Sequence, residues 1–352
     1  MAHLVTRDAP GGTSTPVSGH TPWVMEAGPA GSRLRGRALL VPITLQIVAM
    51  VGIGALVYTS AADWFATFGH NSEISGYVEA VDQQSSSTLI STLSAAENYN
   101  THVPAGMLRD PYSTSGRNVA AEDAAAYAAY ENVMAINGTD AIGTLTYSAL
   151  GIALPIYAGT SDKVLSNGVG HIYGSSLPVG GSSTHAVLTS HSGLLTAALF
   201  TPLHDAAVGQ TFEITTLGET LYYTVESIET VLPDDTSSLQ IVAGEDRVTL
   251  VTCTPIGVNS HRLLVHGIRT SAPADNTGTQ VIAGDGISAG FPWWALIFIG
   301  VSGVTAWLLF TPPRGRGSRG GRGPVVRGAG GSRGGTVSAP LAGAGGHTGR
   351  KR

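Results

Sequence analysis

The sequence predicts a mainly β protein, in which a closed or nearly closed β-barrel is preceded by helices and flanked by two transmembrane helices. Three observations predict this fold class: two long uncharged apolar runs, an acidic segment between them, and short apolar runs after Asn137 separated by turn-forming residues. Only 12% of the 352 residues are charged, and many of the 47 glycines lie near the C-terminal end. This uneven composition indicates apolar spans and a glycine-rich tail around one ordinary domain.

The first apolar run, Leu39 to Tyr58, contains no charge and follows Arg33, Arg35 and Arg37. Its length matches the roughly 20 residues that a membrane-crossing helix needs. Cleavage as a signal peptide is an alternative, because small residues cluster at Ser60 to Ala62. We favour an uncleaved anchor, since the run is longer than the roughly 7 to 15 apolar residues of a signal peptide core.

The second run, Phe291 to Phe310, is also uncharged and has Trp293, Trp294 and Trp307 near its ends, where interfacial aromatic residues belong. We expect a second span here rather than a buried core helix, because nothing globular follows. Arginines come next, in a tail over residues 311–352 that repeats glycine and arginine. Such a composition predicts disorder. RNA binding is conceivable for this tail, but attraction to anionic lipid headgroups is the simpler interpretation.

Charge is strongly segregated along the chain. Residues 1–58 carry four basic and two acidic side chains, residues 59–290 carry six and twenty-two, and residues 291–352 carry nine and none. Lys and Arg resist translocation, so this layout predicts cytoplasmic termini and an extracytoplasmic segment of residues 59–290. Residues 1–38, rich in Gly, Pro and Thr, are expected to form a disordered cytoplasmic arm.

The outer segment is expected to begin with a helical region over residues 59–136. Apolar spacing favours one helix within residues 73–96, although a serine run weakens it, and a clearer amphipathic helix within residues 120–135. Between them, MLRDPYSTSGRN is expected to be an exposed loop, at about residues 105–117, with a Pro-fixed turn.

After Asn137 the chain is typical of an all-β barrel, here assigned to residues 137–272 and followed by a linker over residues 273–290. The predicted strands are Ile142 to Ser148, Leu154 to Tyr157, Ala186 to Thr189, Thr211 to Leu217, Leu221 to Val231, Val248 to Cys253 and Arg262 to Arg269. In the fifth of them, Leu221, Tyr223 and Val225 are expected to share a buried face.

Cys253 is the single cysteine, and it falls in the segment expected outside the membrane, where thiols tend to oxidise or pair. A buried bystander is the commonest role for such a residue. A nucleophile is the alternative, which needs a base and a cationic neighbour. If the last two predicted strands pair through the loop TPIGVNS, Arg262 can lie beside Cys253 and stabilise negative charge on an attacked carbonyl.

The base must come from several histidines, namely His171, His185, His191, His204, His261 and His266. His191 ends the apolar run AVLTS at a strand-to-loop junction, which gives it a modest advantage over His261. Neither metal-ligand spacing, a phosphate-binding glycine loop nor GxSxG is present in the sequence, so we expect no metal and no cofactor.

The segment TLVTCTPIGVNSHRLLVHG, residues 249–267, resembles the signature of class C sortases, whose usual form is TLxTCTPYGxNxHRLLVRG. Residues 154–181 and AVLTSHSGL, residues 186–194, resemble two further blocks of that family, and the resemblance extends over about residues 95–270. It implies a sortase-type barrel in which Cys253 is the nucleophile, His191 the proton donor and acceptor, and Arg262 the oxyanion stabiliser.

The resemblance also implies the reaction and the partners. Cys253 would attack the threonyl carbonyl of an LPxTG-like sorting signal on a pilin or surface protein, and an amine, typically a pilin lysine, would resolve the thioacyl enzyme. Asp110, Pro111 and Tyr112 match the family's lid, with Asp110 engaging Arg262 and Tyr112 covering Cys253.

The sequence departs from the family pattern at Ser192, Leu195, Ile256 and His266, which leaves the sorting motif and the acceptor open. A sortase that anchors proteins to a peptidoglycan precursor is one alternative to the pilus-assembling enzyme. A membrane-bound scaffold that only binds a peptide is another. All three are expected in the membrane of a Gram-positive-type envelope.

Overall fold

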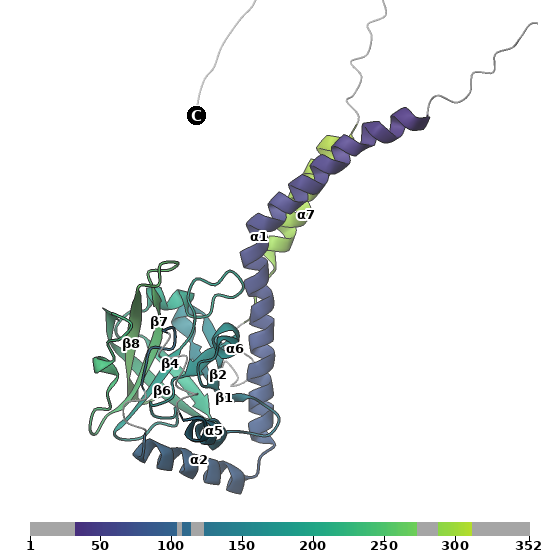
Figure 1. The fold of residues 1–352 in the computed structure, drawn as a ribbon. Coiled ribbons are helices and arrows are strands. Elements are labelled where there is room, and N and C mark those ends of the chain that lie inside the picture. Colours follow the sequence, from purple (N-terminus) through teal and green to yellow (C-terminus); the bar gives the residue numbers. More distant parts are fainter. Residues whose placement is uncertain (1–31, 104–107, 114–122, 273–287, 312–352) are drawn as a thin grey trace, which may run out of the picture. The chain divides into compact units, whose positions relative to one another are not determined.

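The structure is a computed structural model that describes residues 32–103, 108–113, 123–272 and 288–311 (Figure 1). The glycine- and arginine-rich tail beyond Thr311 lies outside the described residues, as do most of the predicted N-terminal arm, most of the predicted linker and both ends of the predicted lid loop. The described part consists of a β-barrel and the helices that precede and follow it.

Helix α1 runs without a break from Ser32 to Asp82, so the predicted span of residues 39–58 is only part of a helix of 51 residues. At the usual rise per residue such a helix is about 76 Å long. It continues past Tyr58 because residues 59–82 contain no proline and only two isolated glycines, which a helix tolerates.

The single helix predicted within residues 73–96 is wrong, because the chain turns after Asp82 and a second helix, α2, runs from Ser86 to Thr101. Ser85 caps α2: its side chain accepts a hydrogen bond from the backbone N–H of Thr88 at 3.2 Å. Serine hydroxyls compete for backbone hydrogen bonds, and therefore the serine run starts a new helix instead of continuing the old one.

Helix α5, Ala124–Val133, is shorter than the range predicted for it and is capped by Asp123, which accepts from Ala126 N at 3.0 Å. Tyr130 fixes α5 to the barrel. Its ring is buried, and its hydroxyl accepts from the backbone N–H of Gly159 at 2.9 Å.

Eight strands form a closed barrel in the order β1-β2-β3-β4-β7-β8-β6-β5, which confirms the predicted fold class. Their bounds are β1 Ala141–Tyr147, β2 Ile152–Ala158, β3 Val169–His171, β4 Thr184–Thr189, β5 Thr211–Thr216, β6 Glu219–Val231, β7 Asp246–Thr254 and β8 His261–Thr270. Short helical turns lie between them: η1 Ser148–Leu150, α6 Asp162–Asn167, η2 Thr201–Asp205 and η3 Ser237–Leu239.

The seven predicted strands are present, but β3 was not predicted. It has three residues, of which the middle one is Gly170, so neither a run of β-branched residues nor an alternation marks it. It is nevertheless required, because it pairs in parallel with β2 and antiparallel with β4.

The barrel interior is filled by aromatic and branched side chains. Leu221, Tyr223 and Val225, predicted to form one buried face, are each at most 3% exposed. Tyr223 stacks on Phe212 with a ring separation of 5.6 Å.

Gly267 of β8 lies directly under this aromatic pair. A Cβ atom at this position would stand 2.5 Å from Cζ of Phe212 and 3.1 Å from Cβ of Tyr223. Because both rings are buried, Gly267→Ala is expected to destabilise the fold by about 1–3 kcal/mol. Thermal unfolding measures the loss. Gly76→Ala is the control, since nothing lies within 4 Å of its added Cβ on α1, and an equal effect of both variants would contradict the packing argument.

Helix α1 is attached to the barrel by its C-terminal half. The hydroxyl of Tyr77, a buried residue, donates to the carbonyl of Ile142 at 3.2 Å and accepts from the backbone N–H of Leu217 at 2.8 Å. This one side chain therefore joins α1 to the first strand and to the turn between β5 and β6.

Two described helices, α1 and α7 (Trp293–Phe310), are long and apolar enough to cross a membrane. They pack against one another. The amide of Gln46 donates to the carbonyl of Ser302 at 3.1 Å, and the indole N–H of Trp64 donates to the carbonyl of Gly290 at 3.1 Å. The second predicted span thus coincides with α7 within two residues.

Candidate active site

The predicted nucleophile and arginine lie opposite one another at one end of the barrel. Cys253 on β7 is the register partner of Arg262 on β8. Directly opposite residues of an antiparallel pair project from the same face of the sheet. The pairing of these two strands through the 255–260 loop, expected from sequence, is therefore what brings the thiol and the guanidinium together.

The predicted histidine lies on the other side of Cys253. Strands β4 and β7 are parallel, with Thr189 opposite Val251, and the chain after β4 continues alongside β7. The hydroxyl of Ser192 donates to the carbonyl of Cys253 at 2.7 Å. His191, two residues beyond Thr189, is thus at the level of Cys253, two residues beyond Val251.

The other candidate histidines have structural contacts. His171 is fully buried, bonded to Ser176 and Tyr130, and burial lowers its pKa to about 4. His185 and His266 both bond the hydroxyl of Thr249, at 2.7 Å and 2.8 Å. His261, the main alternative to His191, is the register partner of Thr254 and bonds the hydroxyl of Ser260 at 2.9 Å.

The middle of the predicted lid, residues 108–113, is described and covers this site. Both carboxylate oxygens of Asp110 accept from Arg262, from Nε at 2.7 Å and from Nη2 at 2.9 Å. The pair is buried, with Asp110 7% and Arg262 6% exposed. Two parallel charge-assisted hydrogen bonds are the strongest contact a carboxylate makes to arginine.

Tyr112 lies between the histidine and the arginine. Its ring is 5.3 Å from the ring of His191, and the guanidinium carbon of Arg262 stands 5.1 Å over it. Its hydroxyl is 2.9 Å from that of Thr189, which donates to the carbonyl of Val251 at 3.0 Å. Thr189 has a single hydroxyl proton, so Tyr112 is the donor.

Leu108 gives the lid an apolar anchor. It packs against a cluster of buried side chains separate from the main core. The cluster comprises Ile172, Val187, Leu239, Val251 and Leu264.

Contacts with Asp110 and with the neighbouring backbone use most of the hydrogen-bond donors of Arg262. Besides its two bonds to Asp110, Arg262 donates from Nη1 to the carbonyls of Asn259 at 3.0 Å and His261 at 2.9 Å. Four of the five N–H donors of an arginine are used in this way. Few donors of Arg262 are therefore left for any further ligand while Asp110 is in place.

Burial favours the uncharged forms of Cys253 and His191. It raises the pKa of the Cys253 thiol, an effect to which the Asp110 carboxylate adds and which Arg262 opposes. Burial also lowers the pKa of His191, which Asp162 of α6 partly offsets. The arrangement therefore favours a thiol beside a neutral imidazole over a thiolate–imidazolium pair.

These opposing charges predict the effect of Asp110→Asn. Removing the carboxylate removes a cause of the raised thiol pKa and leaves Arg262 in place, so the pKa of Cys253 should fall. Alkylation of the thiol, measured against pH, should then reach half its maximal rate at a lower pH than in the wild-type protein. Glu219→Gln, at the start of β6, is the matched control. A profile that stays in place or moves to higher pH would contradict this account.

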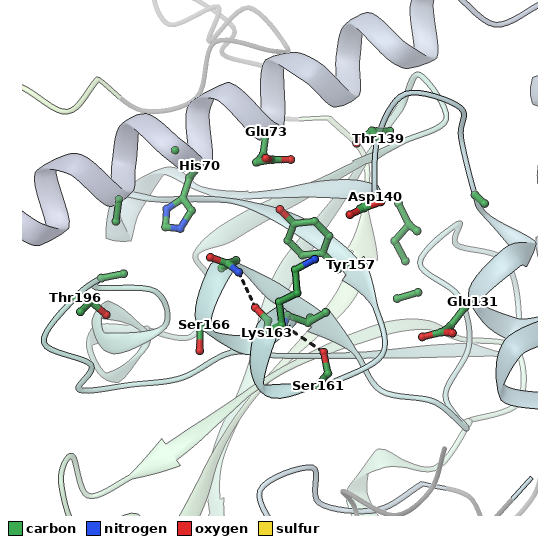
Figure 2. A pocket seen from close by; sticks show the side chains of 18 of the residues that line it. His70, Glu73, Glu131, Thr139, Asp140, Tyr157, Ser161, Lys163, Ser166 and Thr196 are labelled. Atoms are coloured by element: carbon green, nitrogen blue, oxygen red, sulfur yellow. Dashed lines mark hydrogen bonds between the residues drawn. The ribbon is translucent and has the colours of Figure 1, made fainter. Parts of the chain in front are cut away.

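A cavity lies away from these residues. It has a volume of about 910 Å³ and lies between α1, α5 and α6 (Figure 2). His70 and Glu73 of α1 face Lys163 and Tyr157 across it, and none of the sequence-predicted site residues lines it. The cavity is therefore separate from the candidate active site.

Three contacts of the site were not predicted from the sequence: Leu108 on its apolar cluster, Thr189 as the partner of Tyr112, and Ser192 on the carbonyl of Cys253. Leu108 and Thr189 carry no signal, because an apolar residue before a turn and a threonine ending a strand are ordinary. In the sequence, Ser192 is marked only as a departure from the family pattern.

Comparison with known proteins identifies the family. Residues 145–270 match the family model described as the Sortase domain. A curated Sortase A of Streptococcus agalactiae serotype III (strain NEM316) is 29% identical over 153 residues, which is 43% of this chain and 59% of that protein. The match therefore spans about three-fifths of that relative's length.

Solved structures match more extensively. Sortase C1 of Streptococcus agalactiae, in complex with MTSET, is 40% identical, with a TM-score of 0.50 over 57% of this chain and 98% of that one. Sortase C1 of pilus island 1 of group B Streptococcus is 37% identical. Its TM-score is 0.51, and the match covers 62% of this chain and 97% of that one. With a barrel of the same fold and matches over nearly the whole of these class C enzymes, this chain belongs to the sortase family of transpeptidases.

Proposed function

We propose that this chain is a class C sortase, a thiol transpeptidase that cleaves an LPxTG-like sorting signal and joins it to an amine, in pilus assembly a pilin lysine. The observation that carries the proposal is the alignment of His191, Cys253 and Arg262 on neighbouring chain segments at one end of the barrel, under a lid that contacts the histidine and the arginine.

In the proposed reaction, the thiol of Cys253 gives its proton to His191 as its sulfur attacks the threonyl carbonyl carbon of the sorting signal. The guanidinium of Arg262 binds the resulting oxyanion, a type of interaction that is often the largest single contribution to catalysis. His191 gives a proton to the leaving glycine amine as the peptide bond breaks, which leaves a thioacyl enzyme. An incoming amine then loses its proton to His191, attacks the thioester and regenerates the thiol.

The lid determines when these reaction steps can begin. In the described state Asp110 occupies Arg262 and the pKa of Cys253 is raised, so the substrate must displace residues 108–113 before the attack. A resting enzyme with a covered, protonated thiol is also protected from oxidation in an extracytoplasmic setting.

Support for pilus assembly comes from the relatives. One matched structure is of a sortase from a pilus island. In this chain, Asp110 of the Asp-Pro-Tyr segment, which resembles the class C lid, accepts a hydrogen bond from Arg262. Attachment of surface proteins to a peptidoglycan precursor is the second candidate, because the curated relative is a Sortase A.

We also propose that both termini are cytoplasmic and that the barrel lies outside the membrane. The arginines that precede the first apolar run and follow the second support this orientation, because basic residues remain on the cytoplasmic side. The net negative charge of residues 59–290 fits an exported segment.

The test is an intact-mass measurement on the full chain with Tyr112→Ala in detergent, mixed with an LPxTG-type peptide with and without an added amine. We expect an adduct on Cys253 that the amine converts into a ligated peptide. A lysine-containing pilin domain that discharges the adduct faster than a peptidoglycan-precursor amine would favour pilus assembly over anchoring. If no adduct forms with any sorting-motif variant, although small alkylating agents modify the thiol, the barrel would instead be a peptide-binding scaffold.

A further inference from the structure

Two loops beside the candidate active site expose apolar side chains. Leu194 and Leu195, in the loop after β4, are 36% and 66% exposed, and Ile256 and Val258, in the loop between β7 and β8, are 47% and 69% exposed. Single exposed apolar residues are common on protein surfaces, but contiguous ones mark interaction sites. These two loops touch, since a Cβ atom on Gly193 would lie 2.6 Å from the side chain of Ile256.

The first loop is attached to α1. The backbone N–H of Ala198 donates to the carboxylate of Asp63 at 2.6 Å. Asp63 is the first charged residue after the apolar run that ends at Tyr58, and it lies five residues further along the helix. That distance corresponds to about 7.5 Å along the axis, comparable with the headgroup layer on each side of a bilayer, roughly 5–7 Å.

Aromatic residues lie at the same position along the α1 axis as Asp63. The indole N–H of Trp64 bonds the carbonyl of Gly290, and its ring lies 6.1 Å from that of Trp294 at the start of α7. Tryptophans of membrane proteins gather at the headgroup level of the bilayer. Leu195 precedes Ala198 by three residues, so its backbone is within about 11 Å of this level.

We propose that the two loops form a membrane-docking surface, in which Leu195, Ile256 and Val258 enter the lipid headgroup region beside α1. Residues 192–198 and 255–260 contain no charged side chain, so contact with lipid requires no charge to be desolvated and needs no anionic headgroup. The surface holds this end of the barrel against the bilayer. This inference is independent of the transpeptidation chemistry.

A probe at Val258 tests the proposal. The full chain carries Cys253→Ser and Val258→Cys, is labelled with the fluorophore NBD and is placed in nanodiscs of zwitterionic lipid. The matched control is Glu219→Cys in the same background. It adjoins Gly218, whose added Cβ would lie 3.8 Å from Val81 of α1, about 27 Å beyond Asp63 along the helix.

We expect headgroup spin-labelled lipids to quench the probe at Val258 several times more strongly than the probe at Glu219. Equal quenching at both positions would overturn the proposal. So would a probe at Val258 that lipid does not quench and that changes its emission only when an LPxTG-type peptide is added, because the apolar surface would then be part of the peptide site. Circular dichroism establishes that both labelled proteins are folded.

Discussion

Replacing Cys253 with serine is expected to lower the rate of peptide transfer by about 10⁴-fold or more, and alanine is expected to abolish the covalent adduct. A serine hydroxyl titrates far above the thiol, and neither the neutral imidazole of His191 nor Arg262 can activate it comparably. The rate of ligated product and the intact mass of the enzyme measure the two effects.

The histidine alternatives supply the controls for that experiment. His191→Ala should approach the defect of Cys253→Ala, whereas His261→Ala, whose partner is the hydroxyl of Ser260, should retain most of the wild-type rate. An inactive His261→Ala with an active His191→Ala would reverse the assignment. An active Cys253→Ala would remove thiol catalysis from the proposal altogether.

Opening the lid is expected to have the second largest effect. The double variant Asp110→Ala, Tyr112→Ala loses the paired hydrogen bonds to Arg262 and the ring that covers the site. Its thiol becomes accessible and, with Arg262 unpaired, more acidic. Each pKa unit by which the thiol becomes more acidic raises its thiolate fraction about tenfold at a pH below the pKa. We therefore expect alkylation at neutral pH to accelerate by about tenfold or more.

Tyr112→Phe separates the two roles of the tyrosine. It keeps the ring over His191 and Arg262 and removes only the hydrogen bond to Thr189. Its alkylation rate should lie between those of the wild type and the double variant. Equal alkylation rates in the wild-type, Phe and double variants would mean that the lid does not restrict the thiol.

The sequence predicted the parts of this protein that repeat a pattern. Short apolar runs between turn-forming residues identified the barrel strands, uncharged runs identified the two apolar helices, and resemblance singled out Asp110 and Tyr112. It did not predict β3, because three residues around Gly170 leave no periodic signal. It also did not predict the contacts of Leu108 and Ser192, which arise from tertiary packing between segments far apart in the chain.

Because α1 is continuous, it fixes how the barrel is rotated about the helix axis. Hydrogen bonds to the rest of the chain hold this helix at two well-separated points, Asp63 through Ala198 and, fourteen positions later, Tyr77 through Leu217. Inserting one residue between these two points would turn the second contact about 100° around the helix axis relative to the first. Both contacts could not then be made at once. The phase of the helix, as much as its length, therefore sets which way the barrel faces above the apolar span.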